Sequence, residues 1–147
     1  MATKPVAKSA VYAEIEQAFG RVPGWIRQLP DQALESMWGS MRDFYFGETK
    51  LPHKVKELIG IAVSGATRCK YCALFHTEGA RMAGATEEEI AEAAAMAGMS
   101  MNASTFINAM QIDYDEFAKE TREIIAYVKA QEAKQAKPEA AKAARPH

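Results

Sequence analysis

The chain has 147 residues and a mass of 16.1 kDa, a length that suggests one domain. Hydrophobic residues make up 48% and charged residues 25%, as in ordinary globular proteins, so the chain can bury a core without a metal or disulfide staple. The net charge of −1 gives no general electrostatic case for nucleic acid or an anionic membrane as a partner. No apolar run approaches the roughly 18 residues of a spanning helix, and the N-terminus lacks the apolar core of a secretory signal, so we expect a cytoplasmic protein.

Helical periodicity dominates the sequence, and no segment shows the sustained apolar–polar alternation of a strand. We therefore expect an all-α fold. Pro52 is favoured at the first position of a helix, Gly47 at a helix stop, and Thr86 with Glu89 forms a capping-box pattern. In chain order, these signals predict helices over about 11–19, 31–46, 52–66, 69–82, 86–96 and 104 into the 120s.

The composition changes at Lys129. Residues 129–147 contain no Val, Ile, Leu, Met or aromatic side chain, and five basic against two acidic residues give this segment a charge of +3. Such a segment cannot bury enough apolar surface to order itself. We therefore expect a helical domain over residues 1–128 and a disordered Ala/Lys-rich tail over 129–147, with a basic arm for an acidic partner as the alternative.

The two cysteines of the chain, Cys69 and Cys72, lie three residues apart at a predicted helix start. A secreted disulfide scaffold would spread more cysteines along the chain, so this pair favours redox or metal chemistry. His76 follows Cys72 by one helical turn and Cys69 by two, which predicts three reactive side chains in one line. A helix N-terminus stabilises a thiolate, and a thiolate beside a second thiol can be oxidised and close a disulfide.

Glu57 belongs to the preceding predicted helix, about ten residues before a break at Thr67 and Arg68. If the two helices double back, Glu57 comes level with Cys72 and His76. A carboxylate there would orient the imidazole as a base for the thiol. We also expect the two thiols to differ in acidity, with Cys69 nearer the helix end and facing solvent.

Zinc is the main alternative reading of the same residues. Cys69, Cys72 and His76 supply three possible ligands, and Glu57 or His53 a fourth, although no second CxxC or His pair completes a structural site. Haem attachment requires CxxCH, and a thioredoxin-type CxxC follows a strand, so neither pattern is present.

The pattern of Glu57, eleven residues, Cys69-Lys70-Tyr71-Cys72, three residues and His76 resembles the alkylhydroperoxidase AhpD-like branch of the carboxymuconolactone decarboxylase family. The flanking segments 51–59 and 84–90 are similar to that family as well. The resemblance implies an AhpD-like helical bundle, homo-oligomeric as a trimer or hexamer, with no cofactor and no metal. It implies a thiol peroxidase in which peroxide attacks Cys72, Cys69 resolves the product as a disulfide, and Glu57 and His76 form a proton relay.

The resemblance has one departure. The best-known peroxidase of the branch has a histidine just before its second cysteine, whereas this chain has Tyr71, which cannot act as a base near neutral pH. The family's decarboxylase branch generally lacks the CxxC, which disfavours its reaction for this chain.

The leading hypothesis is a cytoplasmic, antioxidant hydroperoxide reductase (an oxidoreductase) with a redox-active CxxC pair and a dithiol or protein reductant. The alternatives are a disulfide reductase or redox relay, and a non-enzymatic redox-sensing oligomer. The crowding of Met41, Phe44, Tyr45 and Phe46 supports an oligomer, because these side chains cannot all point into one helical stripe. We expect some of them to contact another subunit.

Overall fold

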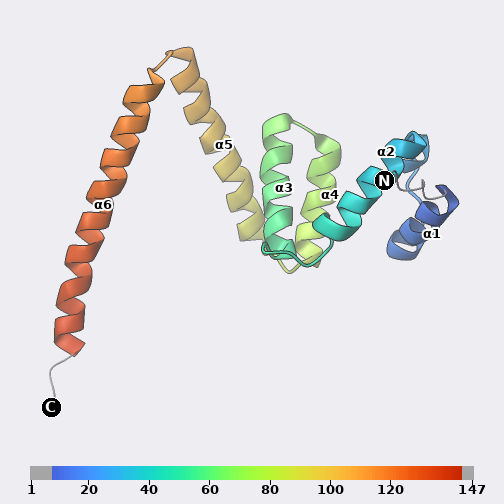
Figure 1. Cartoon of the computed structure of the whole chain (residues 1–147), viewed down its shortest axis with the longest axis horizontal. Helices are drawn as coiled ribbons and strands as arrows, with labels where there is room; N and C mark the ends of the chain where they lie inside the picture. Colours follow the sequence, from blue (N-terminus) through green and yellow to red (C-terminus); the bar gives the residue numbers. More distant parts are fainter. Residues whose placement is uncertain (1–7, 144–147) are drawn as a thin grey trace, which may run out of the picture. The chain divides into compact units, whose positions relative to one another are not determined.

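The structure, a computed structural model, describes residues 8–143, without the side chains of Ser9 and residues 135–143. The all-α prediction is confirmed, since this part of the chain contains helices and no strand (Figure 1). No helix within it is long and apolar enough to cross a membrane. In chain order the elements are α1 (Lys8–Phe19), the 3-10 turn η1 (Ile26–Gln28), α2 (Asp31–Ser40), the π-helical turn η2 (Met41–Tyr45), α3 (His53–Thr67), α4 (Lys70–Met82), α5 (Glu87–Ala109) and α6 (Tyr114–Ala143).

The described part of the chain divides after Ser100 into two compact units. The first unit holds α1 to α4 and the beginning of α5, and the second holds the rest of α5 and α6. All four predicted site residues belong to the first unit. The predicted boundary between a helical domain and a tail, at residue 129, differs from this division and stays a prediction.

The N-terminal core of the first unit forms where α1, η1 and α2 meet. Apolar residues four apart on α1 and on α2 put one stripe of each helix inside, and each buried side chain contributes roughly 1.5–3 kcal/mol. Trp38 packs edge-on against Phe19, with ring centroids 5.6 Å apart, and its indole N–H donates to Glu14 at 2.8 Å. The buried cluster consists of Val11, Ile15, Val22, Ile26, Leu34 and Trp38.

Helices α3 and α4 lie side by side and run in opposite directions (Figure 1). As predicted, α3 begins directly after Pro52 and breaks at Thr67 and Arg68. Arg68 takes the left-handed conformation, with φ 56° and ψ 34°, which turns the chain immediately into α4. Cys69 is the N-cap residue of α4, so the predicted helix reversal is confirmed.

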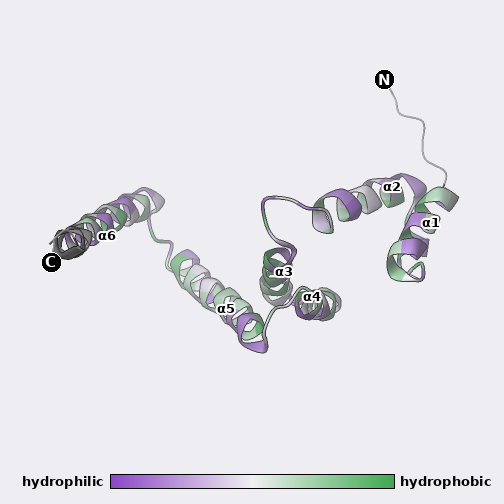
Figure 2. Cartoon of the chain, turned by 90° about the horizontal axis from the view of Figure 1, so that it is seen from below, coloured by the Kyte–Doolittle hydropathy of each residue, from purple (hydrophilic) through white to green (hydrophobic). Residues whose placement is uncertain are grey.

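The prediction of separate helices over 86–96 and from 104 onward is wrong, because α5 is continuous over Glu87–Ala109. Gly98 in its middle costs only about 1 kcal/mol against alanine, too little to stop a long helix. The break falls later, where Gln111 has φ 52° and the Asp113 carboxylate accepts from the Glu116 N–H at 2.9 Å to start α6. Figure 2 shows hydrophobic and hydrophilic residues intermixed along α5 and α6.

The start of α5 is confirmed in detail. The Thr86 hydroxyl accepts from the Glu89 N–H at 3.2 Å, and the Glu89 carboxylate accepts from the Thr86 N–H at 2.8 Å, which completes the predicted capping box. Lys54 on α3 donates to the same Glu89 at 2.7 Å and ties the first turn of α5 to the α3–α4 pair.

Residues 129–143, which the sequence predicts to be disordered, continue α6 in the structure. Alanine, lysine, glutamine and glutamate dominate this stretch, and all four have high helix propensity. The segment therefore adopts a helix although it has no large apolar side chain to bury. The rest of the predicted tail, residues 144–147, lies outside the described residues.

Candidate active site

The structure brings Glu57 and His76 into direct contact. Glu57 lies on α3 with only 1% of its surface exposed, and His76 lies on the facing side of α4. The His76 Nδ1 donates to Glu57 Oε2 at 2.9 Å. The helix reversal thus places the carboxylate against the imidazole, as the sequence predicts.

Two glycines let the helices approach this closely, and sequence reasoning missed both. A Cβ added at Gly79 of α4 would lie 2.5 Å from Glu57 Oε1, and one added at Gly60 of α3 would collide with the His76 ring. Each helix therefore has a glycine at the position that faces the functional side chain of the other helix. A glycine inside a helical pattern is the sequence signal for such a close approach.

His53 makes a second contact with the buried carboxylate. Its Nε2 lies 3.0 Å from Glu57 Oε1, one turn later on α3, so each carboxylate oxygen has an imidazole nitrogen beside it. The sequence suggested His53 only as an optional zinc ligand. Position 53 is four residues before Glu57, a spacing at which side chains on a helix meet.

Tyr45 completes the cluster from η2. Its hydroxyl lies 3.1 Å from His76 Nδ1. Burial, followed by the hydrogen bond to the Glu57 carboxylate, raises the pKa of Tyr45, so the phenol stays protonated and acts as a donor. The sequence marks Tyr45 only by its crowded aromatic neighbours, because nothing in its local pattern indicates a contact 31 residues away.

The backbone conformation at Met41–Tyr45 aims Tyr45 at the site. Lys56 of α3 is buried, and its ammonium group donates to the carbonyl oxygens of Phe44 at 2.6 Å and Gly47 at 2.8 Å. A Cβ at Gly47 would collide with a backbone carbonyl oxygen one turn earlier, so glycine is needed at this predicted helix stop. A π-helical turn of this kind often marks a functional site.

The two cysteines are free thiols in direct contact, with their sulfurs 2.9 Å apart. The Cys69 sulfur also accepts from the Cys72 N–H at 3.4 Å at the start of α4. The hydrogen bond between the two thiols, together with backbone N–H groups, lowers the pKa of Cys69, whereas the same hydrogen bond and burial raise the pKa of Cys72. Cys69 is therefore the more acidic thiol, and His76, one turn from Cys72, is not the cause of the difference.

The expectation that Cys69 faces solvent more than Cys72 is wrong. Cys72 is exposed and Cys69 is half-buried. The reason is that Cys69, as N-cap, turns its side chain inward over the first turn of α4, where the backbone N–H groups point.

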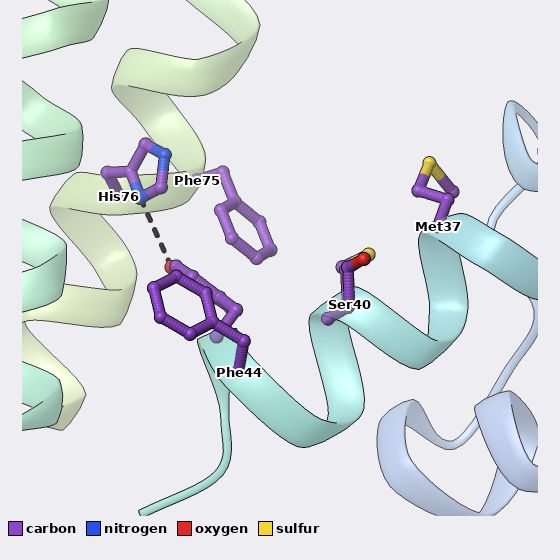
Figure 3. A pocket seen from close by; sticks show the side chains of 7 residues that line it. Met37, Ser40, Phe44, Phe75 and His76 are labelled. Atoms are coloured by element: carbon purple, nitrogen blue, oxygen red, sulfur yellow. Dashed lines mark hydrogen bonds between the residues drawn. The ribbon is translucent and has the colours of Figure 1, made fainter. Parts of the chain in front are cut away.

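A cavity of about 330 Å³ joins Cys72 to the Glu57 cluster. His76 and Cys72 both line it, and most of its remaining wall is apolar. A second cavity, of about 310 Å³, lies beside His76 between η2 and α4, where Phe44, Phe75 and His76 line it (Figure 3). Tyr45 and His76 line both cavities. The apolar lining of the first cavity includes Phe44, Leu51, Ile59 and Val63.

The alternative zinc set is not assembled in the part of the chain that the structure describes. Within it, no three His, Cys, Asp or Glu side chains form a group with metal-binding geometry. The two thiols instead contact one another, and His76 Nδ1 is turned to Glu57.

Three comparisons place this chain among known proteins. A crystal structure of the alkylhydroperoxidase AhpD core from Rhodospirillum rubrum is similar, with a TM-score of 0.64 and 32% identity, covering 79% of this chain and 96% of that chain. A crystal structure of a protein from Methanobacterium thermoautotrophicum gives a TM-score of 0.52 and 39% identity, covering 60% of this chain and 97% of that chain. Each of these likenesses rests on both sequence and fold.

A curated relative from Paracoccus denitrificans, described as uncharacterized protein 4 in cox locus, is 36% identical over 61 residues. The match takes in 42% of this chain and 55% of the relative, so it spans about half of that protein's length. Residues 32–115, which include the whole α3–α4 pair, match the Carboxymuconolactone decarboxylase family. The chain therefore belongs to the carboxymuconolactone decarboxylase family, in its AhpD-like branch.

Proposed function

We propose that this protein is a thiol-dependent hydroperoxide reductase that uses the Cys69–Cys72 pair with Glu57 and His76 as its proton relay. One observation carries the proposal. Two free thiols lie 2.9 Å apart, and Cys72 lines the same apolar cavity as an imidazole that is paired with a buried carboxylate. The family membership supports the same class of chemistry.

In the first step, His76 accepts the proton of the Cys72 thiol, and the Cys72 thiolate attacks the outer oxygen of a hydroperoxide. The O–O bond breaks, the alcohol leaves with the proton from His76, and Cys72 becomes a sulfenic acid. In the second step, Cys69 attacks the Cys72 sulfur, and hydroxide leaves and is protonated to water. The products are an alcohol, water and a Cys69–Cys72 disulfide.

The lowered pKa of Cys69 keeps it available as the thiolate that closes the disulfide, whereas Cys72, whose pKa is raised, must first give its proton to the relay. Cys72 is the exposed member of the pair and the one that lines the cavity, so an entering hydroperoxide meets it first.

The apolar cavity suits an organic hydroperoxide, and a dithiol or protein reductant would return the disulfide to thiols. We further propose a cytoplasmic homo-oligomer, a trimer or hexamer. Large apolar side chains are exposed on several helices of the described chain, more than an isolated subunit should leave in water. Examples are Phe44, Leu74, Met82, Phe106 and Ile124.

Steady-state consumption of tert-butyl hydroperoxide with a dithiol donor tests the proposal. We expect turnover by the wild type, none by Cys69→Ser or Cys72→Ser, and a loss of about a hundredfold in Glu57→Gln, within the usual range for acid–base catalysis. Lys54→Gln, which alters a contact with α5 but leaves the site in place, is the matched control and should keep full activity.

Two results would favour the alternatives instead. Disulfide exchange with the donor but no peroxide loss would indicate a disulfide reductase or redox relay. One round of oxidation by peroxide without turnover would indicate a redox-sensing oligomer.

A further inference from the structure

The Glu57 carboxylate is held by more groups than a simple Glu–His pair requires. His53 Nε2 lies 3.0 Å from Glu57 Oε1, and His76 Nδ1 lies 2.9 Å from Glu57 Oε2. Gly79 of α4 lies against the same carboxylate, where a side chain would collide with it. Since Glu57 is 1% exposed, its partners in the protein decide which way the two oxygens face.

The hydrogen-bonding state of His53 follows from its surroundings. Its Nδ1 is buried and has no hydrogen-bond partner in the described chain. A neutral imidazole carries one N–H, and here the only acceptor, Glu57, faces Nε2. His53 therefore carries its proton on Nε2 and acts as a fixed donor to the carboxylate.

Tyr45 controls the other side of the cluster. Its hydroxyl lies 3.1 Å from His76 Nδ1, the same nitrogen that meets Glu57 (the bond drawn to His76 in Figure 3). Because the Glu57 carboxylate 2.9 Å from this nitrogen can only accept, Nδ1 carries the proton, and the Tyr45 oxygen is its second acceptor. Two acceptors then converge on one N–H.

We propose that His53 and Tyr45 are positioning residues that set the tautomer of His76. Together they orient Glu57 so that His76 holds its proton on Nδ1 and leaves Nε2 unprotonated as an acceptor. If the carboxylate turned away, the proton would be free to move to Nε2, and the imidazole would become a donor that cannot take a proton from a thiol. The link to Cys72 rests on the proposed function, whereas the tautomer does not.

Nitrogen-15 NMR of the reduced protein measures the tautomer directly, because protonated and unprotonated imidazole nitrogens differ widely in chemical shift. The chain has three histidines, so the spectra of a His53→Gln and a His147→Gln variant assign the His76 signals. We expect the wild type to show His76 as the Nδ1–H form.

The variants separate positioning from folding. His53→Leu removes the donor to Oε1 and should give a mixture of His76 tautomers and a roughly tenfold slower oxidation of Cys72, a smaller loss than the factor of about a hundred or more that removal of a general base costs. His53→Gln keeps an N–H donor at that position and should restore both. Tyr45→Phe keeps the ring and should shift the tautomer without unfolding the protein.

The outcomes distinguish this proposal from the proposed function. A wild-type His76 with the proton on Nε2, or an unchanged tautomer in both His53→Leu and Tyr45→Phe, would overturn the inference. A tautomer that shifts as expected in a protein without peroxide turnover would support the inference and reject the proposed function.

Discussion

The contact between Gly79 and Glu57 leads to a prediction that runs against helix propensity. Replacing a glycine inside a helix by alanine normally stabilises a protein by about 1 kcal/mol. At Gly79 the added Cβ would lie 2.5 Å from Glu57 Oε1 and 2.6 Å from its carboxyl carbon, so the carboxylate must move. Moving it breaks the hydrogen bond from His76 to the buried carboxylate, worth about 1.5–3 kcal/mol, and disturbs the 3.0 Å contact with His53.

The loss of these contacts to Glu57 exceeds the gain in helix propensity. Gly79→Ala should therefore lower the free energy of unfolding by about 0.5–2 kcal/mol, the loss of the His76 bond less the gain in helix propensity, measured by urea denaturation at a fixed protein concentration. Gly98→Ala is the matched control, because Gly98 lies in the middle of α5 with nothing within 4 Å of its added Cβ, and it should raise that free energy by up to about 1 kcal/mol. A Gly79→Ala variant as stable as the wild type, or more so, would refute the account of how α3 and α4 fit together.

Three further predictions follow from other parts of the chain. Since the pKa of Cys69 is lowered and that of Cys72 raised, iodoacetamide should label Cys69 first as pH rises from acidic values, and peptide mass spectrometry that finds Cys72 labelled first would contradict this. Arg68→Gly should stabilise the protein by about 1 kcal/mol in urea, because glycine adopts φ 56° without a steric cost, and a less stable variant would contradict the assigned turn. Light scattering should give a mass of three or six 16.1 kDa subunits, and a monomer at all concentrations would contradict the proposed oligomer.

Local patterns predicted most of the helical framework. Pro52 and the Thr86–Glu89 capping box mark real helix starts, since capping depends on residues within one turn of each other. The pairing of Glu57 with His76 followed from one further assumption, that the helices double back at Arg68. The length of α5 was missed because the local pattern of the residues between the two predicted segments does not decide between helix and loop, whereas the helix is continuous over Glu87–Ala109.

The remainder of the site depends on contacts between segments distant in sequence. Tyr45 reaches His76 through a π-helical turn that Lys56 fixes from another helix, and no periodicity in either segment indicates this. Gly60 and Gly79 have meaning only once their facing partners are known. Residues that complete the site from outside the CxxC motif therefore could not be predicted from the sequence alone.

The central claim is that Cys72 and Cys69 reduce a hydroperoxide in that order, and intact-mass spectrometry after one equivalent of tert-butyl hydroperoxide tests it most directly. The account predicts that the wild type loses two hydrogen atoms as the Cys69–Cys72 disulfide forms, and that Cys69→Ser instead gains one oxygen atom on Cys72. An unchanged wild-type mass would contradict the claim, and an oxygen gained by Cys69 in Cys72→Ser, with none gained by Cys72 in Cys69→Ser, would reverse the assigned order.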